Sequence, residues 1–193
     1  MSPRTKKQLD AHRAARHNEI LLIALRLFAA KGYFNTSIND IAKAAQISKG
    51  LLYSYFDNKE QLLNAAIQYA LTEATRLNTE QDMGGSDPKE KFSKTIDTFF
   101  VMLTDKKELW SLIVSLAIHV GNIPSVHSII SDTYKGIGIK LKQVLEDLSV
   151  ENPEEEALKL SALLDGIGIQ YLIFGEEFPL DRIKGNIIKT YVE

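Results

Sequence analysis

Residues 37–56 read SINDIAKAAQISKGLLYSYF. Ser37, with Asp40 three residues later, has the form of a capping box, in which a hydroxyl and a carboxylate satisfy the free amides at a helix start. Ser48 is of the same capping type and stands before a second apolar run. Two helices of about two turns each, joined by a break of about three residues, are typical of a helix-turn-helix.

The second of these helices is the expected recognition helix, because in such a motif it enters the major groove of DNA by its N-terminal end. That end carries Ser48, Lys49 and Gly50. Free amides attract phosphate there, a lysine reaches a phosphate or a guanine edge, and glycine admits a close backbone approach. The further contacts expected are Leu51 with a thymine methyl group, and Tyr53, Tyr55 and Lys59 with phosphates. The alternative is that both helices only cover a core, as Leu52 and Phe56 are expected to do.

The remainder of the chain is also predicted to be helical. Asp87-Pro88 and Asn152-Pro153 each place a capping residue before a proline at the first helical position. Apolar residues recur at helical spacing, as in the stripe from Ile20 to Phe28. Gly84-Gly85-Ser86 is the clearest linker. The expected fold is all-α, with about nine helices near residues 10–31, 37–44, 48–54, 59–80, 88–104, 107–120, 124–148, 153–175 and 179–191.

Charge is distributed unevenly along a chain of otherwise ordinary globular composition. The 193 residues are 45% hydrophobic and 25% charged, and the absence of cysteine excludes a disulfide framework, a thiolate zinc site and a thiol nucleophile. Residues 1–60 contain ten Lys and Arg against five Asp and Glu, which gives a net charge of +5 there and −7 in the remainder. The basic third can approach an anion, whereas the acidic remainder is repelled by one. The alternative is a solvated surface with accidental asymmetry.

No stretch holds the ~18 uncharged apolar residues of a membrane helix. The basic start and the apolar stretch Ile20–Ala30 loosely resemble a signal peptide, but Glu19 precedes that stretch and Arg26 interrupts it. A cytoplasmic protein is therefore expected.

Two stretches resemble the start of TetR-family transcriptional regulators, FAAKGYFNTSINDIA at residues 28–42 and ISKGLLYSYFDNKEQLL at residues 47–63. The resemblance implies a homodimer in which a three-helix DNA-binding domain, residues 1–58, is joined by a long helix to an effector-binding and dimerisation domain, residues 59–193. One departure is Gln46, where the family commonly has glycine. If that turn position needs a left-handed backbone, a non-glycine residue costs ~1 kcal/mol there. The DNA-side residues that the resemblance implies are Ser37, Ser48, Lys49, Gly50, Leu51, Tyr53, Tyr55 and Lys59.

The family pattern also implies dimerisation through the last two helices. Gly166 and Gly168 stand inside the first of these, and each costs ~1 kcal/mol against alanine, which a close approach between helices would offset. The alternative is that both helices only complete the monomer core. The expected residues of the dimer interface are Leu164, Gly168, Tyr171, Ile183 and Ile187.

A small hydrophobic effector is expected to bind among the helices near 88–104, 107–120 and 124–148. Small-molecule pockets are mostly apolar and aromatic with a few polar tips, although plain core is the alternative for each candidate. His119 and His127 are conceivable as a metal pair, but no third ligand stands nearby, so no metal and no cofactor is expected. The candidate pocket residues are Phe99, Met102, Leu103, Trp110, His119 and Tyr134.

Three classes of function follow from these patterns. The expected one is a ligand-responsive transcriptional regulator, a repressor that a small effector releases from a palindromic operator. The alternative is a DNA-binding regulator without an effector, controlled by a protein partner or by abundance. An enzyme is not expected, because the sequence has no nucleophile elbow, phosphate loop, paired catalytic carboxylates or metal cluster.

Overall fold

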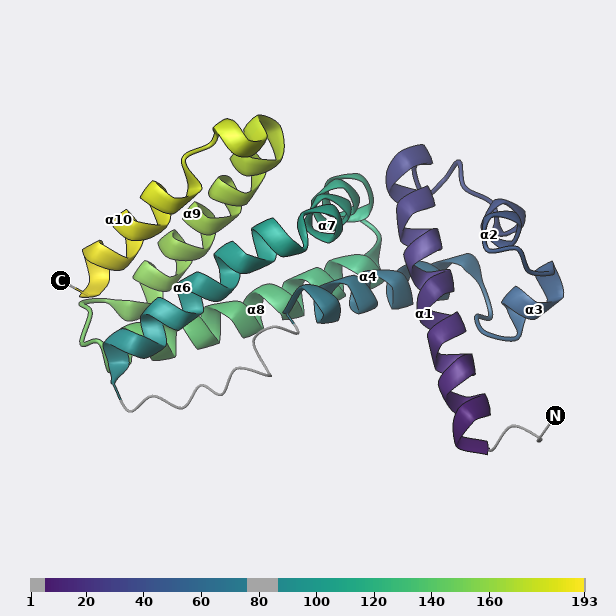
Figure 1. Cartoon of the computed structure of the whole chain (residues 1–193), viewed down its shortest axis with the longest axis horizontal. Coiled ribbons are helices and arrows are strands. Elements are labelled where there is room, and N and C mark those ends of the chain that lie inside the picture. The colour runs from purple at the N-terminus through teal and green to yellow at the C-terminus, as the bar shows by residue number, and fades with distance from the viewer. Residues whose placement is uncertain (1–5, 76–86, 193) are drawn as a thin grey trace. The chain divides into compact units, whose positions relative to one another are not determined.

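All regular structure is helical in residues 6–75 and 87–192, which the computed structural model describes (Figure 1). In the first range, side chains are described for residue 8 and for residues 10–74. The all-α prediction is confirmed. The predicted linker at residues 84–86 lies outside the described residues. The helices are α1 (Lys6–Lys31), α2 (Ile38–Ala44), α3 (Lys49–Tyr53), α4 (Lys59–Thr75), α6 (Pro88–Asp105), α7 (Lys107–Val120), α8 (Pro124–Asp147), α9 (Pro153–Phe174) and α10 (Leu180–Val192), with a 3-10 turn η1 (Gly175–Glu177) after α9.

Capping residues set where several of these helices begin. The Ser37 hydroxyl accepts a hydrogen bond from the Asp40 amide at 3.1 Å, and the Asp40 carboxylate accepts one from the Ser37 amide at 2.9 Å, so the predicted capping box is present. The Ser48 hydroxyl accepts from the Leu51 amide at 3.1 Å at the start of α3. Asp87 caps α6 in the same way.

Asn152 does not cap α9, and the prediction that it would is wrong. Its backbone is left-handed, with φ 52° and ψ 57°, and its side chain makes no capping hydrogen bond. A capping side chain reaches the next amides only from a residue whose backbone is extended. Pro153 therefore starts α9 without that support.

The described residues form two compact units. One, the N-terminal unit, holds the residues up to Thr72 together with Ser115–His127, and the other, the C-terminal unit, holds the remainder. The division differs from a single cut between residues 58 and 59, so the functional boundary at that point stays a prediction.

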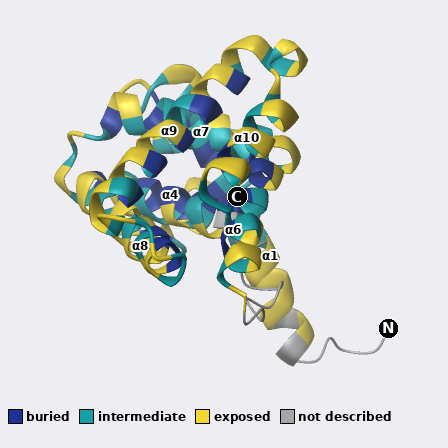
Figure 2. Ribbon diagram, turned by 90° about the vertical axis from the view of Figure 1, so that its left-hand side faces the viewer, coloured by how far each residue is buried: buried dark blue, intermediate teal, exposed yellow. Residues whose placement is uncertain are grey.

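The N-terminal unit is built on the buried face of α1. Ile20, Ala24 and Phe28 are almost fully buried, as their spacing predicts. Leu52 of α3 and Phe56 are buried as well, which confirms their predicted place in the core. Residues 10–15 of α1 are exposed (Figure 2). The short helices α2 and α3 are thus fixed by apolar contacts that leave their polar faces outward.

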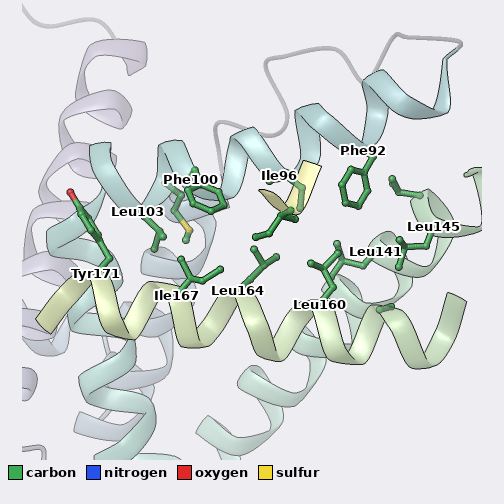
Figure 3. Close-up of a cluster of buried hydrophobic side chains, with 14 of the residues drawn as sticks. Phe92, Ile96, Phe100, Leu103, Leu141, Leu145, Leu160, Leu164, Ile167 and Tyr171 are labelled. Carbon is green, nitrogen blue, oxygen red and sulfur yellow. The ribbon is translucent and has the colours of Figure 1, made fainter. Parts of the chain in front are cut away.

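The C-terminal unit has its core between α6 and α9, and α10 packs along α6. Figure 3 shows Leu160, Leu164, Ile167 and Tyr171 of α9 pointing toward Phe92, Ile96, Phe100 and Leu103 of α6. Leu141 and Leu145 of α8 close one end of this core.

One helix has a second apolar face. By length and composition alone, Pro153–Glu177 is apolar enough to cross a membrane, although only 33% of its most apolar window is buried. Core helices of water-soluble proteins meet the same criterion, and Lys159 and Asp165 stand inside the helix. The exposed part of α9 therefore needs an explanation other than the monomer core.

Candidate functional site

The start of α3 presents polar and apolar side chains to solvent together. Ser48, Lys49 and Gly50 are exposed, and Leu51 and Tyr53 each expose 43% of their surface. The Lys49 ammonium lies 5.9 Å from the centre of the Tyr53 ring. The exposed side of this short helix thus carries a cation, an aliphatic group, an aromatic ring and a glycine. Its opposite side, at Leu52, is buried. This arrangement suits the groove and backbone of DNA.

The turn before α3 has the left-handed residue that was expected there. Gln46 has φ 54°, so the prediction for this position is confirmed. Its amide donates to the Lys43 carbonyl at 3.1 Å, and the Ile47 amide donates to the Ala42 carbonyl at 3.0 Å, which is the Schellman pattern of helix termination. The guanidinium of Arg16 on α1 donates to the Ala45 carbonyl at 2.6 Å and so ties this turn to α1.

Lys59 is part of an internal link as well as a candidate phosphate contact. Its ammonium donates to the carbonyls of Tyr33 at 3.0 Å and Thr36 at 3.1 Å, and it lies 4.3 Å from the centre of the Tyr33 ring. These contacts join the start of α4 to the connection between α1 and α2. A contact of Lys59 with DNA stays a prediction.

Ser37 is similarly engaged within the chain. Its hydroxyl donates to the Asp40 carboxylate at 2.6 Å and accepts from the Asp40 amide. The hydrogen bonds from the Ser37 side chain and backbone lower the pKa of the Asp40 carboxyl below its ordinary value. Ser37 therefore acts first as a cap that holds α2 in place, and its contact with DNA stays a prediction.

Residues of α1 that the sequence reasoning missed lie beside the end of α3. The Arg13 guanidinium is 5.7 Å from the centre of the Tyr55 ring. His17, one turn further along α1, has its ring 5.1 Å from the Phe56 ring and 6.0 Å from the Tyr55 ring. The four-residue spacing of Arg13 and His17, which puts both on one helix face, was the available signal. Tyr55 is thereby positioned from α1.

In the C-terminal unit, the structure brings together four of the six candidate pocket residues. Met102 and Leu103 are buried, and the rings of Phe99 and Trp110 meet edge to face at 6.3 Å and 81°. The indole nitrogen of Trp110 is buried without a hydrogen-bond partner. The indole edge faces Gly168 of α9, where an added Cβ would lie 2.8 Å from that nitrogen.

His119 and Tyr134 do not belong to this cluster. His119 is nine residues beyond Trp110 on α7, an axial rise of about 13 Å, and it falls in the N-terminal unit. The Tyr134 hydroxyl donates to the Asp165 carboxylate of α9 at 2.8 Å. Burial raises the pKa of Asp165. Among the described residues, no group of three or more His, Asp or Glu side chains is placed to hold a metal ion.

The expected dimer residues lie against neighbours of their own chain. Leu164, Gly168, Tyr171 and Ile187 are buried by neighbours of the same chain, and Ile183 is half-buried against the same core. Their contact with a second copy stays a prediction. The apolar side chains that α9 does expose are Leu158, Leu163, Ile169, Ile173 and Phe174.

Comparison with protein families agrees with this geometry. The model of the tetR family of bacterial regulatory proteins matches residues 20–66, from the second half of α1 to the first turns of α4. The C-terminal model of the BetI-type transcriptional repressors matches residues 88–193, more than half of the chain. The chain belongs to the TetR family. As a TetR-family regulator, it is a DNA-binding transcription factor and not an enzyme.

Curated relatives of this TetR-family regulator match about half of the chain. The uncharacterized HTH-type transcriptional regulator YerO of Bacillus subtilis is 37% identical over 98 residues, 50% of this chain and 34% of YerO. The HTH-type transcriptional repressor KstR2 of Rhodococcus jostii is 32% identical over 88 residues, 46% of this chain and 43% of KstR2. The matches thus span about a third to less than half of the relatives' own length.

Solved structures share the fold of this TetR-family chain over almost its full length. A putative transcriptional regulator from Saccharomonospora viridis, solved with choline, is 22% identical, with 93% of this chain and 96% of that chain covered and a TM-score of 0.76. AibR, solved with isovaleryl coenzyme A and operator DNA, is also 22% identical, with coverages of 92% and 98% and a TM-score of 0.68.

Proposed function

We propose that this TetR-family protein is a repressor that binds a palindromic operator as a homodimer and is released by a small hydrophobic effector. The observation that carries the proposal is the match of residues 88–193 to the BetI-type repressor model. A repressor is also what the name of the relative KstR2 states of that protein. Such a regulator works in the cytoplasm, where bacterial DNA lies.

The proposed operator contacts follow the exposed face of α3 and its flanks. Lys49 and the tyrosines would meet phosphates, while Leu51 would meet a base edge. The positions at the start of α3 are exposed, whereas the side chains of Ser37 and Lys59 are held by hydrogen bonds to other parts of the N-terminal unit. The proposed contact residues are Ser37, Ser48, Lys49, Gly50, Leu51, Tyr53, Tyr55 and Lys59.

The proposed effector site is the cluster around Phe99 and Trp110. A buried N–H without an acceptor is unfavourable, so a ligand that brings an acceptor would gain there. An apolar molecule with one carbonyl or carboxylate oxygen has the required chemistry. Two structural relatives were solved with small molecules, choline in one and isovaleryl coenzyme A in the other, which supports an effector of some kind here.

The proposed dimer uses the exposed face of α9. Leu158, Ala162, Gly166, Ile169 and Ile173 recur at helical spacing along that face. Nothing lies within 4 Å of the position that a Cβ on Gly166 would occupy, so a second helix can approach the backbone there. Two copies joined through such faces would form a twofold dimer with two recognition helices. Two symmetric DNA-binding domains select palindromic DNA.

The test is selection of DNA from a random pool, followed by transcription in vitro from a promoter that carries the enriched sequence. Two inverted half-sites, one or more helical turns apart, and reduced transcription are expected. A single half-site would exclude the symmetric dimer. Raised transcription would make the protein an activator instead.

A further inference from the structure

Gln46 is the only non-glycine residue with a left-handed backbone in the described part of the N-terminal unit. Its conformation is set by the two hydrogen bonds of the Schellman pattern, Gln46 to Lys43 and Ile47 to Ala42. Glycine is the usual residue at this position because any Cβ is unfavourable there. A glutamine lowers the ratio of folded to unfolded protein by about fivefold relative to an unstrained residue.

The side chain of Gln46 does not offset this strain through a hydrogen bond within the described residues. The Gln46 side chain is exposed, and it makes no hydrogen bond to the described residues. Arg16 stabilises the turn through the carbonyl of Ala45, a contact that needs no particular side chain at residue 46. Strained residues of this kind often lie at functional sites, and Gln46 differs from the equally strained Ser149 by standing next to the start of α3.

The position of Gln46 brings it close to the expected DNA surface. It lies two residues before Ser48, and two residues of chain span at most about 7 Å. Ser48, Lys49 and Gly50 beyond it are all exposed. A glutamine side chain carries an amide group with two N–H donors, and neutral amides are common donors to phosphate oxygens.

We propose that Gln46 binds the DNA backbone, donating its side-chain amide to a phosphate next to the recognition helix, and that the turn retains its strain for this contact. The proposal rests on DNA binding, which the family establishes, and not on the repressor or effector proposals. It predicts that relief of the strain and loss of DNA affinity go together.

The chain offers a matched control for the strain. Ser149 has φ 59° and ends α8 with the same pattern, since its amide donates to Glu146 at 2.9 Å and the Val150 amide donates to Leu145 at 3.0 Å. Ser149 is exposed and belongs to the C-terminal unit. Ser149→Gly therefore relieves the same backbone strain in the unit that does not contain α3.

The experiment compares Gln46→Gly, Gln46→Glu and Ser149→Gly in the full chain. Affinity is measured for the duplex that the wild-type protein enriches from a random pool and for an unrelated duplex of equal length. Urea denaturation gives the stability of each variant. Gln46→Gly is expected to be as stable as or more stable than the wild type, like Ser149→Gly, yet to bind both duplexes about three- to tenfold more weakly, the range for one hydrogen bond. Gln46→Glu should weaken both at least as much, because a carboxylate repels phosphate.

Wild-type affinity of Gln46→Gly for both duplexes would overturn the proposal. A loss confined to the selected duplex would also overturn it, because that result assigns Gln46 to a base and not to the backbone. Equal losses for Gln46→Gly and Ser149→Gly would show a general effect of the turn substitution and would overturn it as well.

Discussion

Gly168 is explained by a side chain of its own chain. A Cβ at this residue would lie 2.8 to 3.0 Å from three atoms of the Trp110 indole, so the ring could not keep its place against α9. We expect Gly168→Ala to lower the free energy of unfolding by about 1–3 kcal/mol, the usual effect of overpacking a buried contact. Denaturation in urea measures this change.

Gly136 provides the control for that substitution. It also stands inside a helix, but nothing lies within 4 Å of the position of an added Cβ. Gly136→Ala should raise the free energy of unfolding by up to about 1 kcal/mol through helix propensity alone. If both alanine variants gain stability, the packing of the Trp110 indole against α9 does not require glycine at residue 168.

Lys59 and Lys49 should separate stability from DNA binding. Lys59→Met removes two hydrogen bonds to backbone carbonyls and the ammonium on the Tyr33 ring. We expect the free energy of unfolding, measured without DNA, to fall by about 1–3 kcal/mol, since the carbonyls of Tyr33 and Thr36 each lose the hydrogen bond from Lys59. Lys49→Ala, at an exposed position, should leave the free energy of unfolding unchanged. Equal losses for the two variants would mean that both lysines stabilise the fold.

Lys49→Ala should instead change the salt dependence of DNA binding. If its ammonium neutralises one phosphate, the slope of log affinity against log salt becomes shallower by about 0.9. Titrations at several salt concentrations give the slope. Lys140→Ala, at an exposed position of α8, is the control and should have the wild-type slope. An unchanged slope for Lys49→Ala would remove the phosphate assignment.

At the scale of elements, the sequence predicted where helices begin better than which way they face. The caps at Ser37, Ser48 and Asp87 act through neighbours a few residues away, so local sequence suffices to recognise them. The expected dimer residues could not be chosen from local sequence in the same way. Because α9 is apolar on two faces, spacing alone cannot say which face the monomer buries.

Local sequence also could not predict the contacts of Gly168 and of α1 with residues distant in the chain. Gly168 fits Trp110, which is 58 residues away in sequence, and only the packed chain reveals that pairing. Arg13 meets Tyr55 across 42 residues. Gln46 was the favourable case, because a left-handed turn residue is fixed by bonds that span only a few positions.

An exposed position of α9 and a buried position of α10 should respond differently to a charge. Ile173, 68% exposed, lies on the proposed dimer surface, whereas Ile187 of α10 is buried in the core. Ile173→Asp should yield a folded monomer, while Ile187→Asp should unfold, since an unpaired buried charge is strongly unfavourable. Sedimentation and circular dichroism distinguish the outcomes. A dimer that survives Ile173→Asp would place the interface elsewhere.

At the scale of the whole molecule, the proposed repressor must couple two sites. α7 begins in the C-terminal unit with Trp110 and ends in the N-terminal unit, so one continuous helix belongs to both. An effector can lower DNA affinity only if it binds one arrangement of the units better than the other. A coupling of ~1–3 kcal/mol gives a 5- to 150-fold change, and it must be reciprocal. Operator DNA should therefore weaken effector binding by the same factor.

The measurement begins with a thermal-shift screen of apolar molecules that carry one hydrogen-bond acceptor. Each molecule that binds is then titrated with and without the selected duplex. Trp110→Ala and Phe99→Ala should abolish binding of a coupled molecule, since they remove the rings that line the proposed site. Molecules that bind equally well in both titrations would mean that the C-terminal unit does not sense them. Coupled binding that survives both substitutions would place the effector site away from this cluster.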